Sequence, residues 1–163
     1  MGKVLIIEKD VKTIEVLELL FQALEQQYEV THTHSNATRI YNAEQVEAIF
    51  MSPELPLVEP RVFMDGIEAT SAERNRSRAP VIFLYTDDEI VRRYELNKLP
   101  DSQLVKKPVT MEQVYELLDG LGLTKLKVMV DSQQVKDKIA RFGNFIEQSE
   151  TWMDRLKKHL MKS

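Results

Sequence analysis

The chain has 163 residues, of which 43% are hydrophobic and 29% are charged, and its formal net charge at pH 7 is -4. That balance is typical of a soluble globular protein of one domain, or one domain with an appendage, and excludes a disordered chain. Because there is no cysteine, disulfides, thiolate metal sites and cysteine nucleophiles are excluded as well. No apolar run approaches the roughly 18 residues of a membrane span, and the N-terminal residues lead directly into a strand pattern, so we expect a cytoplasmic protein.

The first third of the chain alternates between strand and helix patterns. A short apolar run at 3–7 predicts a buried strand, and Asp10 can cap a helix whose apolar residues recur at helical spacing. Strand patterns at 28–34 and 46–51 follow, with a short helix pattern at 36–44 between them.

The alternation continues after a loop that contains three prolines. Two capping signatures mark helix starts, Thr86 with Glu89 and Thr110 with Gln113. Alternation of this kind predicts a doubly wound α/β fold, in which helices cover both faces of a five-stranded parallel sheet. The elements expected here are a weak helix at 65–75, a strand at 80–85, a helix at 87–97, a strand at 102–106 and a helix at 111–121.

The C-terminal part of the chain differs in charge and in pattern. Residues 1–122 carry 13 Lys+Arg against 21 Asp+Glu, a net charge of -8, whereas residues 123–163 carry 9 against 5, a net charge of +4. We therefore divide the chain into a domain at 1–122 and an extension of connector and amphipathic helix at 123–163. The helix has an apolar stripe with heptad spacing, which predicts dimerisation or binding of a partner helix, with packing in cis as the alternative. The stripe and its flanking aromatics are Val135, Ile139, Phe142, Phe145, Ile146, Trp152, Met153, Leu156 and Leu160.

Five motifs, in their order along residues 1–122, resemble the receiver domain of bacterial two-component response regulators. They are KVLIIEKD at the first strand, SPELP after the third, MDGIE beginning the third helix, PVIFLYT at the fourth strand and LVKKPVT at the fifth. The resemblance implies a flavodoxin-like fold. It also implies a site at the carboxyl edge of the sheet, where open α/β sheets keep their functional groups.

In that family a histidine kinase supplies a phosphoryl group to an aspartate after the third strand. Mg²⁺ is held by that aspartate and an acidic pair after the first strand, and a small hydroxyl residue and a lysine bind the phosphoryl group. Carried over position by position, most of this apparatus is missing here, and only the lysine matches. The corresponding residues are Ser52 for the phosphoacceptor, Glu8 and Lys9 for the acidic pair, Tyr85 for the hydroxyl residue, Leu104 for a switching aromatic and Lys107 for the lysine.

These changes predict a site without metal chemistry. A serine hydroxyl ligates Mg²⁺ poorly and cannot form an acyl phosphate, and the ammonium of Lys9 repels a dication. We predict that Lys9 or Lys107 pairs with Glu8, and also with Glu54, in place of a metal. The alternative is that Glu54 or Asp10 supplies a displaced ligand that rescues metal binding.

The loop after Ser52 is twelve residues long up to Asp65, about six more than the family pattern has. Its composition predicts a stiff insertion that covers the mouth of the former site, with an ordinary surface loop as the alternative. The residues behind this prediction are Pro53, Leu55, Pro56, Leu57, Val58, Pro60, Val62 and Phe63.

Two weaker signals carry no function of their own. His32 and His34 lie two apart on a predicted strand and so point the same way, but without a third ligand we expect a polar strand face and no metal. The basic clusters at 73–78 and 155–158 could touch nucleic acid, which we do not expect because the body of the protein is acidic.

Together these observations predict a degenerate receiver that is not an enzyme, needs no cofactor and binds a protein partner independently of phosphorylation. In the family, the face made by the fourth helix, fifth strand and fifth helix meets partners, which corresponds here to residues within 87–97 and 111–120. Two alternatives stay open. One is a phospho-accepting regulator with a displaced carboxylate, and the other is a structural subunit of a larger assembly.

Overall fold

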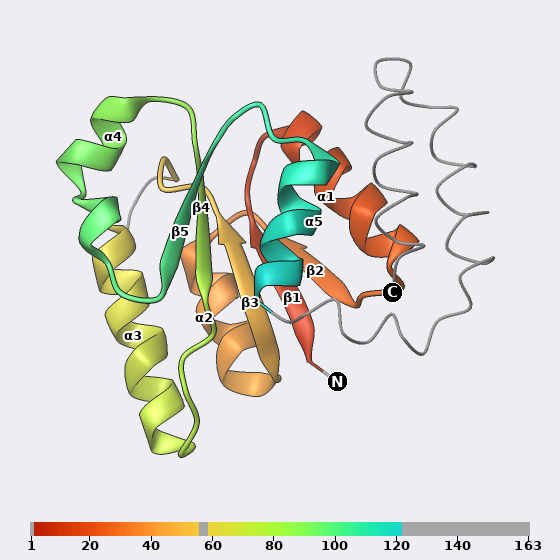
Figure 1. Cartoon of the computed structure of the whole chain (residues 1–163). Coiled ribbons are helices and arrows are strands. Elements are labelled where there is room, and N and C mark those ends of the chain that lie inside the picture. The colour runs from red at the N-terminus through yellow and green to blue at the C-terminus, as the bar shows by residue number, and fades with distance from the viewer. Residues whose placement is uncertain (1, 56–58, 122–163) are drawn as a thin grey trace. The chain divides into compact units, whose positions relative to one another are not determined.

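The computed structural model describes residues 2–55 and 59–121. Within them one sheet contains five parallel strands in the order β2-β1-β3-β4-β5 (Figure 1). This order reverses direction between β1 and β3, as in flavodoxin-like folds. The predicted fold class, an α/β protein on a five-stranded parallel sheet, is confirmed. The strands are β1 (Lys3–Ile7), β2 (Tyr28–Thr31), β3 (Val46–Met51), β4 (Val81–Tyr85) and β5 (Ser102–Lys106).

The helices alternate with the strands, as the sequence predicts, and two of the predicted caps are confirmed. Asp10 accepts hydrogen bonds from the backbone at the start of α1. Thr110 accepts from the backbone N–H of Gln113, whose side chain accepts in return from the Thr110 N–H, a complete capping box. The helices are α1 (Val11–Ala23), α2 (His34–Ala43), α3 (Pro60–Glu73), α4 (Asp88–Arg93) and α5 (Met111–Gly120), with a 3-10 turn, η1 (Leu96–Lys98), after α4.

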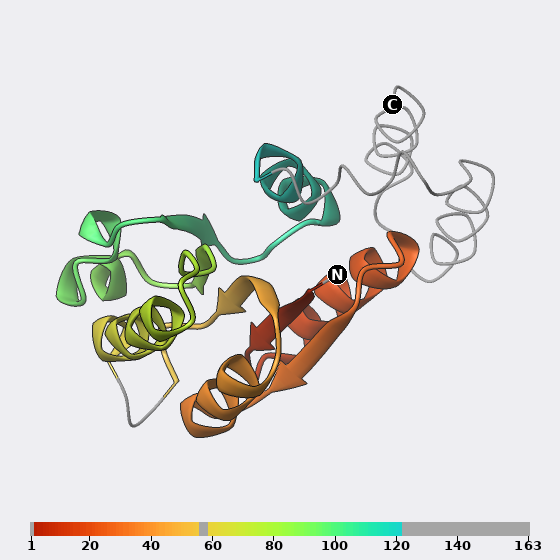
Figure 2. The same ribbon diagram turned by 90° about the horizontal axis from the view of Figure 1, so that it is seen from below.

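Helices α2 and α3 lie side by side on one face of the sheet (Figure 2). Alternate strand residues point to this face, so the apolar runs of β1, β3 and β4 each contribute two or more side chains to one cluster. Burial of each large side chain stabilises the fold by roughly 1.5–3 kcal/mol. The cluster includes Leu5, Ile7, Ile49, Met51 and Phe83 from the strands, Ile40, Tyr41, Phe63, Met64 and Ile67 from the helices, and Leu96 from η1.

The third helix begins earlier than the sequence predicts. It starts at Pro60, five residues before Asp65, because proline at the first helical position has a suitable φ and lacks only an N–H that would be unpaired there anyway. Phe63 is buried in the core, whereas Val62 is 60% exposed. The prediction of a twelve-residue loop up to Asp65 is therefore wrong, since residues 60–64 belong to α3.

The two histidines do not share a strand face. β2 ends at Thr31 and His34 is the first residue of α2, capped by Thr33, whose hydroxyl accepts from the Asn36 N–H at 3.1 Å. His34 is 5% exposed, and its ring lies 5.5 Å from that of Phe63. His32 lies outside the core with Nδ1 at 2.7 Å from the Glu8 carbonyl oxygen. The predicted strand at 28–34 is three residues too long, because the capping threonine starts a helix where a polar strand face was expected.

The arginines of the basic cluster at 73–78 are held by contacts within the fold. Arg74 and Arg76 donate to the carbonyl oxygen of Tyr41 at 3.4 and 3.5 Å, and Arg78 donates to the carbonyl oxygens of Ala79 and Pro100. These bonds join the end of α3 to α2 and to the start of β5, so a structural role accounts for this cluster.

The predicted C-terminal helix lies outside the described residues, with its whole stripe from Val135 to Leu160, and so do Pro56, Leu57 and Val58. Among the residues that are described, no helix has the length and apolarity needed to cross a membrane.

Candidate functional site

Four segments converge at the carboxyl edge of the sheet because all its strands run in the same direction. Glu8 follows β1, Ser52 follows β3, Thr86 follows β4 and Lys107 follows β5. Parallel pairing of β1 with β3, β3 with β4 and β4 with β5 brings these four chain ends to one edge. The edge is therefore where the predicted site residues can meet.

Glu8 and Lys107 form a buried ion pair at this edge. The Lys107 Nζ lies 2.8 Å from Glu8 Oε2, and the two side chains are only 9% and 3% exposed. The other carboxylate oxygen, Oε1, accepts from the backbone N–H groups of Lys9 and Asp10 at 2.9 and 3.1 Å. The sequence predicted Lys9 or Lys107 as the partner of Glu8, and the partner is Lys107. Removing one partner of such a pair typically lowers the free energy of unfolding by about 3–5 kcal/mol, because the other charge is then buried without a partner.

The backbone fixes where Lys107 can reach. Its N–H donates to the carbonyl oxygen of Tyr85 at 2.7 Å, which extends the β4–β5 pairing by one bond, and its peptide bond to Pro108 is cis. Tyr85 itself is half-buried at the end of β4. Lys9, in contrast, is exposed to solvent, so the ammonium that enters the site belongs to Lys107 and not to Lys9.

Asp10 acts as a helix cap beside the pair. The Thr13 hydroxyl donates to Asp10 Oδ2 at 2.5 Å. This bond, assisted by the charge of Lys107 and by backbone N–H groups of α1, holds the pKa of Asp10 below its ordinary value. The carboxylate is thus ionised and already held by partners from its own helix.

Ser52 occupies the position that the resemblance gives to the phosphoacceptor. It is 3% exposed, its N–H donates to the Ile7 carbonyl oxygen at 2.9 Å, and its Oγ accepts from the Glu54 N–H at 3.3 Å. The hydroxyl therefore stabilises the turn that leaves β3, a common local use of serine.

Glu54 and Thr86 form a contact that sequence reasoning missed. Glu54 Oε1 accepts from both the N–H and the hydroxyl of Thr86, at 3.1 and 2.5 Å. Thr86 was expected to cap α4, but the cap is Asp87, whose carboxylate accepts from the Glu89 N–H at 2.9 Å. The prediction that Glu54 shares the lysine of the site is wrong, because Thr86 takes its carboxylate. Thirty-two residues separate the two, so no local pattern signals this contact.

Leu104, at the predicted switch position on β5, is half-buried and packs against the edge of the core cluster. Three half-buried residues of the α4 segment, Ile90, Val91 and Tyr94, pack against the same cluster. An aliphatic residue at this place continues the apolar core outward toward α4.

The residues at this edge do not fit Mg²⁺. Hard dications take several oxygen ligands, usually carboxylates, carbonyls and water. Here Glu8 is paired with Lys107, Asp10 with Thr13 and Glu54 with Thr86. Among the described residues, no group of three or more acidic or histidine side chains is placed to hold a metal.

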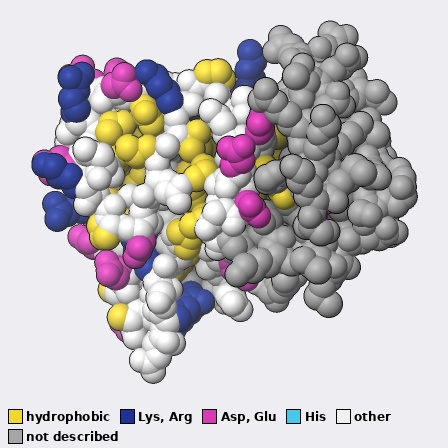
Figure 3. Space-filling model, in the orientation of Figure 1, with side chains coloured by type: hydrophobic (Ala, Val, Ile, Leu, Met, Phe, Trp, Pro, Cys, Tyr) yellow, Lys and Arg dark blue, Asp and Glu magenta, His cyan; other side chains and the backbone are white. Residues whose placement is uncertain are grey.

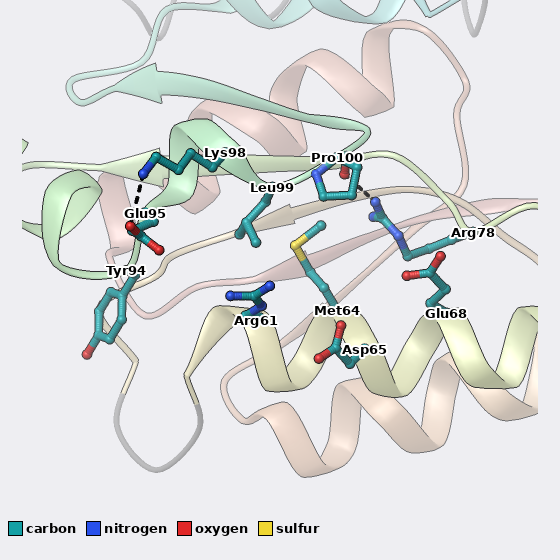
Figure 4. Close-up of a pocket in the computed structure, with 10 residues that line it drawn as sticks. All are labelled: Arg61, Met64, Asp65, Glu68, Arg78, Tyr94, Glu95, Lys98, Leu99 and Pro100. Carbon is teal, nitrogen blue, oxygen red and sulfur yellow. Dashed lines mark hydrogen bonds and ion pairs between the residues drawn. The ribbon is translucent and has the colours of Figure 1, made fainter.

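A separate pocket of about 280 Å³ lies between α3 and the segment that contains α4 and η1 (Figure 4). Met64 of α3 faces Leu99 and Pro100 across it. Its charged rim is partly neutralised, since Lys98 Nζ lies 3.1 Å from Glu95 Oε1. The remaining lining residues are Arg61, Asp65, Glu68, Arg78 and Tyr94. The pocket is distinct from the edge that holds Glu8 and Lys107.

The outer side of α4 is charged. Asp88, Glu89, Arg92 and Arg93 are all exposed. In the space-filling view, side chains of both signs gather at the upper left, where Figure 1 labels α4 (Figure 3).

Comparison with known proteins gives no match in sequence and clear matches in structure. No protein-family model and no curated protein sequence matches the chain. The receiver domain of a sensor histidine kinase from Pseudomonas aeruginosa, crystallised with magnesium in its active-site cleft, matches with a TM-score of 0.63 at 20% identity. The match covers 74% of this chain and 98% of that one. The fold is that of a receiver domain.

Two further matches show how widely this receiver fold is shared. The chemotaxis response regulator CheY4 of Vibrio cholerae has a TM-score of 0.62 at 16% identity and covers 74% of this chain and 98% of its own. The receiver domain of Ssk1 from Saccharomyces cerevisiae, crystallised with the phosphotransfer protein Ypd1, has a TM-score of 0.61 at 15% identity, with 76% and 92% covered. Identities this low establish the fold alone.

Proposed function

We propose that this protein is a degenerate receiver that signals by binding a protein partner and not by accepting a phosphoryl group. The observation that carries the proposal is the buried pair of Glu8 with Lys107, at 2.8 Å. The one lysine that matches the family is already neutralised by Glu8, which stands at the first position of the family's acidic pair. An ion pair thus takes the place of the metal.

The chemistry of Ser52 supports the same proposal. Phosphoryl transfer to a receiver needs a carboxylate nucleophile and a bound dication, whereas Ser52 offers a neutral hydroxyl that is buried and engaged with the Glu54 backbone. A serine nucleophile requires an adjacent base, and the carboxylates of Glu8 and Glu54 at this edge are held by Lys107 and Thr86. The site is therefore proposed to be structural, and the protein to have no enzymatic activity.

A protein partner is the proposed target. The Ssk1 receiver domain, which shares this fold, was crystallised in complex with Ypd1. For this chain we propose two docking elements in signal transduction. One is the charged surface of α4, and the other is the C-terminal helix, through which the chain dimerises or clasps a partner helix.

Labelling with a small phosphodonor tests the loss of phosphotransfer. The full-length chain is incubated with acetyl phosphate and Mg²⁺, and its intact mass is measured beside a working receiver treated identically. We expect the control to gain a phosphoryl group and this chain to gain none. A stoichiometric phosphoryl adduct on this chain, whether stable or labile in acid, would contradict the proposal and favour a displaced phosphoacceptor.

The role of the C-terminal helix needs a separate test. Light scattering on a sizing column gives the mass of the full-length chain and of a variant with Ile139→Glu and Ile146→Glu. Because both positions lie on the stripe, a dimer through this helix should become a monomer. A mass that is unchanged by the substitutions would exclude dimerisation through the stripe.

A further inference from the structure

His34 is buried without a hydrogen-bond partner for its ring. It is 5% exposed, and neither Nδ1 nor Nε2 has a partner among the described residues. Buried polar side-chain atoms in folded proteins are nearly always hydrogen-bonded, because an unpaired one loses its bonds to water and gains none. The neutral ring is therefore already destabilising at this position, and a second N–H would be more so.

The ring is covered by a side chain of α3. It lies 5.5 Å from the ring of Phe63, with an angle of 31° between the two planes, and Phe63 is itself only 4% exposed. Since α2 and α3 lie side by side (Figure 2), this contact joins the first residue of α2 to the first turn of α3. Each ring therefore contributes to the burial of the other.

Protonation of His34 is disfavoured at this position for two independent reasons. Burial lowers the pKa of the ring below its ordinary 6.5, because the charged form would lose its hydration. His34 is also the first residue of α2, where the backbone N–H groups of a helix N-terminus repel a cation. The packed contact therefore requires a neutral ring.

The acidic side chains of the neighbouring segments do not compensate a charge on this ring. Burial alone accounts for the shift in the pKa of His34, with no contribution from a carboxylate of the described residues. These acids are either exposed or bound to other partners, and they are Glu59 and Asp65 at the start of α3 and Glu8 and Glu54 at the sheet edge. A protonated ring thus has no ion pair available in its buried position.

The first turn of α3 is the weaker side of the contact. The side chain of its N-cap residue, Glu59, makes no capping bond, whereas the hydroxyl of Thr33 caps α2. Val62 in the same turn is 60% exposed, so little apolar surface other than that of Phe63 and Met64 holds this turn to the core. Helix ends with unpaired N–H groups and few buried contacts open locally at a lower free energy than the core.

We propose that His34 is a pH-sensitive switch that releases the start of α3 from the start of α2. The neutral ring packs on Phe63 and keeps the contact closed. A proton binds when the ring leaves its buried position, so acidification populates a state in which Phe63 is uncovered and the first turns of both helices are open. The uncovered side chain adds apolar surface for a partner at acidic pH. The switch is independent of whether the protein transfers phosphoryl groups.

Hydrogen exchange on the full-length chain at pH 7.5 and pH 5.5 tests the switch. The amides of Phe63 and Ala37 report on the first turns of α3 and α2, since they donate to the carbonyl oxygens of Glu59 and Thr33. The amide of Ile49, which is bonded to the Pro80 carbonyl oxygen, reports on the sheet. Protection factors, which correct for the pH dependence of exchange itself, are measured over a series of low urea concentrations.

Two variants remove the titrating group. His34→Phe keeps an aromatic ring, and His34→Leu keeps only apolar volume. His32→Gln is the matched control, because His32 is an exposed histidine in the same segment.

In the wild type and the control, the protection factors of the Phe63 and Ala37 amides should fall roughly tenfold from pH 7.5 to pH 5.5. That is the effect of a group with an ordinary pKa of about 6.5 that takes up a proton only on opening. Their exchange should depend weakly on urea, unlike that of Ile49, because local opening exposes little surface. In both His34 variants the fall with pH should disappear.

Three results would overturn the proposal. One is a wild type whose Phe63 and Ala37 amides show no fall, and another is a fall that persists in both His34 variants. The third is a Phe63 amide with the same protection factor and the same urea dependence as Ile49 at both pH values. Exchange of the first turn would then require unfolding of the sheet as well, and no local opening would exist.

Discussion

Two neighbouring lysines at the end of β5 make the same kind of contact in opposite surroundings. Lys106 lies 3.1 Å from Asp88 with the two side chains 52% and 65% exposed, and Lys107 lies 2.8 Å from Glu8 with both nearly buried. Exposed pairs are worth about 0–1 kcal/mol, whereas breaking a buried pair costs about 3–5 kcal/mol. Because the N–O distances of the two pairs are similar, burial accounts for the difference in how much each pair stabilises the fold. The edge of the sheet thus has a rigid centre at Glu8 and Lys107 and a loosely held rim at α4.

Breaking the buried pair should give the largest effect. Lys107→Met keeps the side-chain length and removes the charge, which leaves the buried carboxyl group of Glu8 with only two backbone N–H groups as partners. We expect the free energy of unfolding to fall by about 3–5 kcal/mol at pH 7. Urea denaturation measures the loss. A loss below 1 kcal/mol would mean that solvent reaches Glu8, and the contrast with Lys106 would disappear.

Combining Glu8→Gln with Lys107→Met in one variant tests whether the two buried side chains act as a pair. The double variant removes both charges, so it should recover much of the stability that Lys107→Met loses. Strictly additive losses in the denaturation midpoints would show that the two side chains do not act as a pair.

A pH titration tests a second buried group, His34 at the start of α2. Burial lowers the pKa of His34 below its ordinary 6.5. The folded state therefore favours the neutral ring, its stability is full above pH 6.5, and it declines as the pH falls below that value, by up to about 1.4 kcal/mol per pH unit. His34→Phe should flatten this slope just below pH 6.5, whereas the control His32→Gln should keep it. An equal slope in both variants would assign the effect to other groups.

Thr13→Val should have a smaller effect, because Asp10 is exposed. The Thr13 hydroxyl lowers the pKa of Asp10, so its contribution is present above the unfolded value of 3.8 and is lost as the pH falls through the folded pKa. We expect the variant to lose about 1 kcal/mol at pH 7, and the difference from the wild type to shrink below that window. Denaturation at both pH values measures it, and a deficit that does not depend on pH would point to packing alone.

Lys106→Met should have the smallest effect. Because its pair with Asp88 is exposed, we expect a change of less than about 1 kcal/mol, which weakens further with added salt. Urea denaturation at low and high salt beside Lys107→Met gives the comparison directly. If Lys106→Met lowered the free energy of unfolding as much as Lys107→Met does, the rim at α4 would not be loosely held.

The strands were predictable from the sequence, and the contacts at their ends were not. Buried parallel strands are continuous apolar runs, so 3–7 and 46–51 were found with the correct bounds. Pro60 was assigned to a loop although proline also begins helices, which moved the start of α3 by five residues. Local pattern alone does not distinguish these two uses of proline.

The site shows the same limit. The positions of Glu8, Ser52 and Lys107 followed from the order of the strands. Which lysine enters the site did not, because Lys9 and Lys107 lie two residues and one residue beyond the end of a strand, and only the packed structure shows that Lys9 is exposed. The Glu54–Thr86 contact depends on two loops meeting in space, for which a single sequence has no signal.

The most direct test of the central claim is a calorimetric titration of the full-length chain with Mg²⁺. With Lys107 paired to Glu8 and Ser52 in place of a carboxylate, we expect no saturable binding up to about millimolar concentrations, and none in Ser52→Asp, since the ion pair remains. Saturable binding tighter than about millimolar in the wild-type chain would contradict the account, because a metal and the buried Lys107 ammonium cannot both occupy the Glu8 carboxylate.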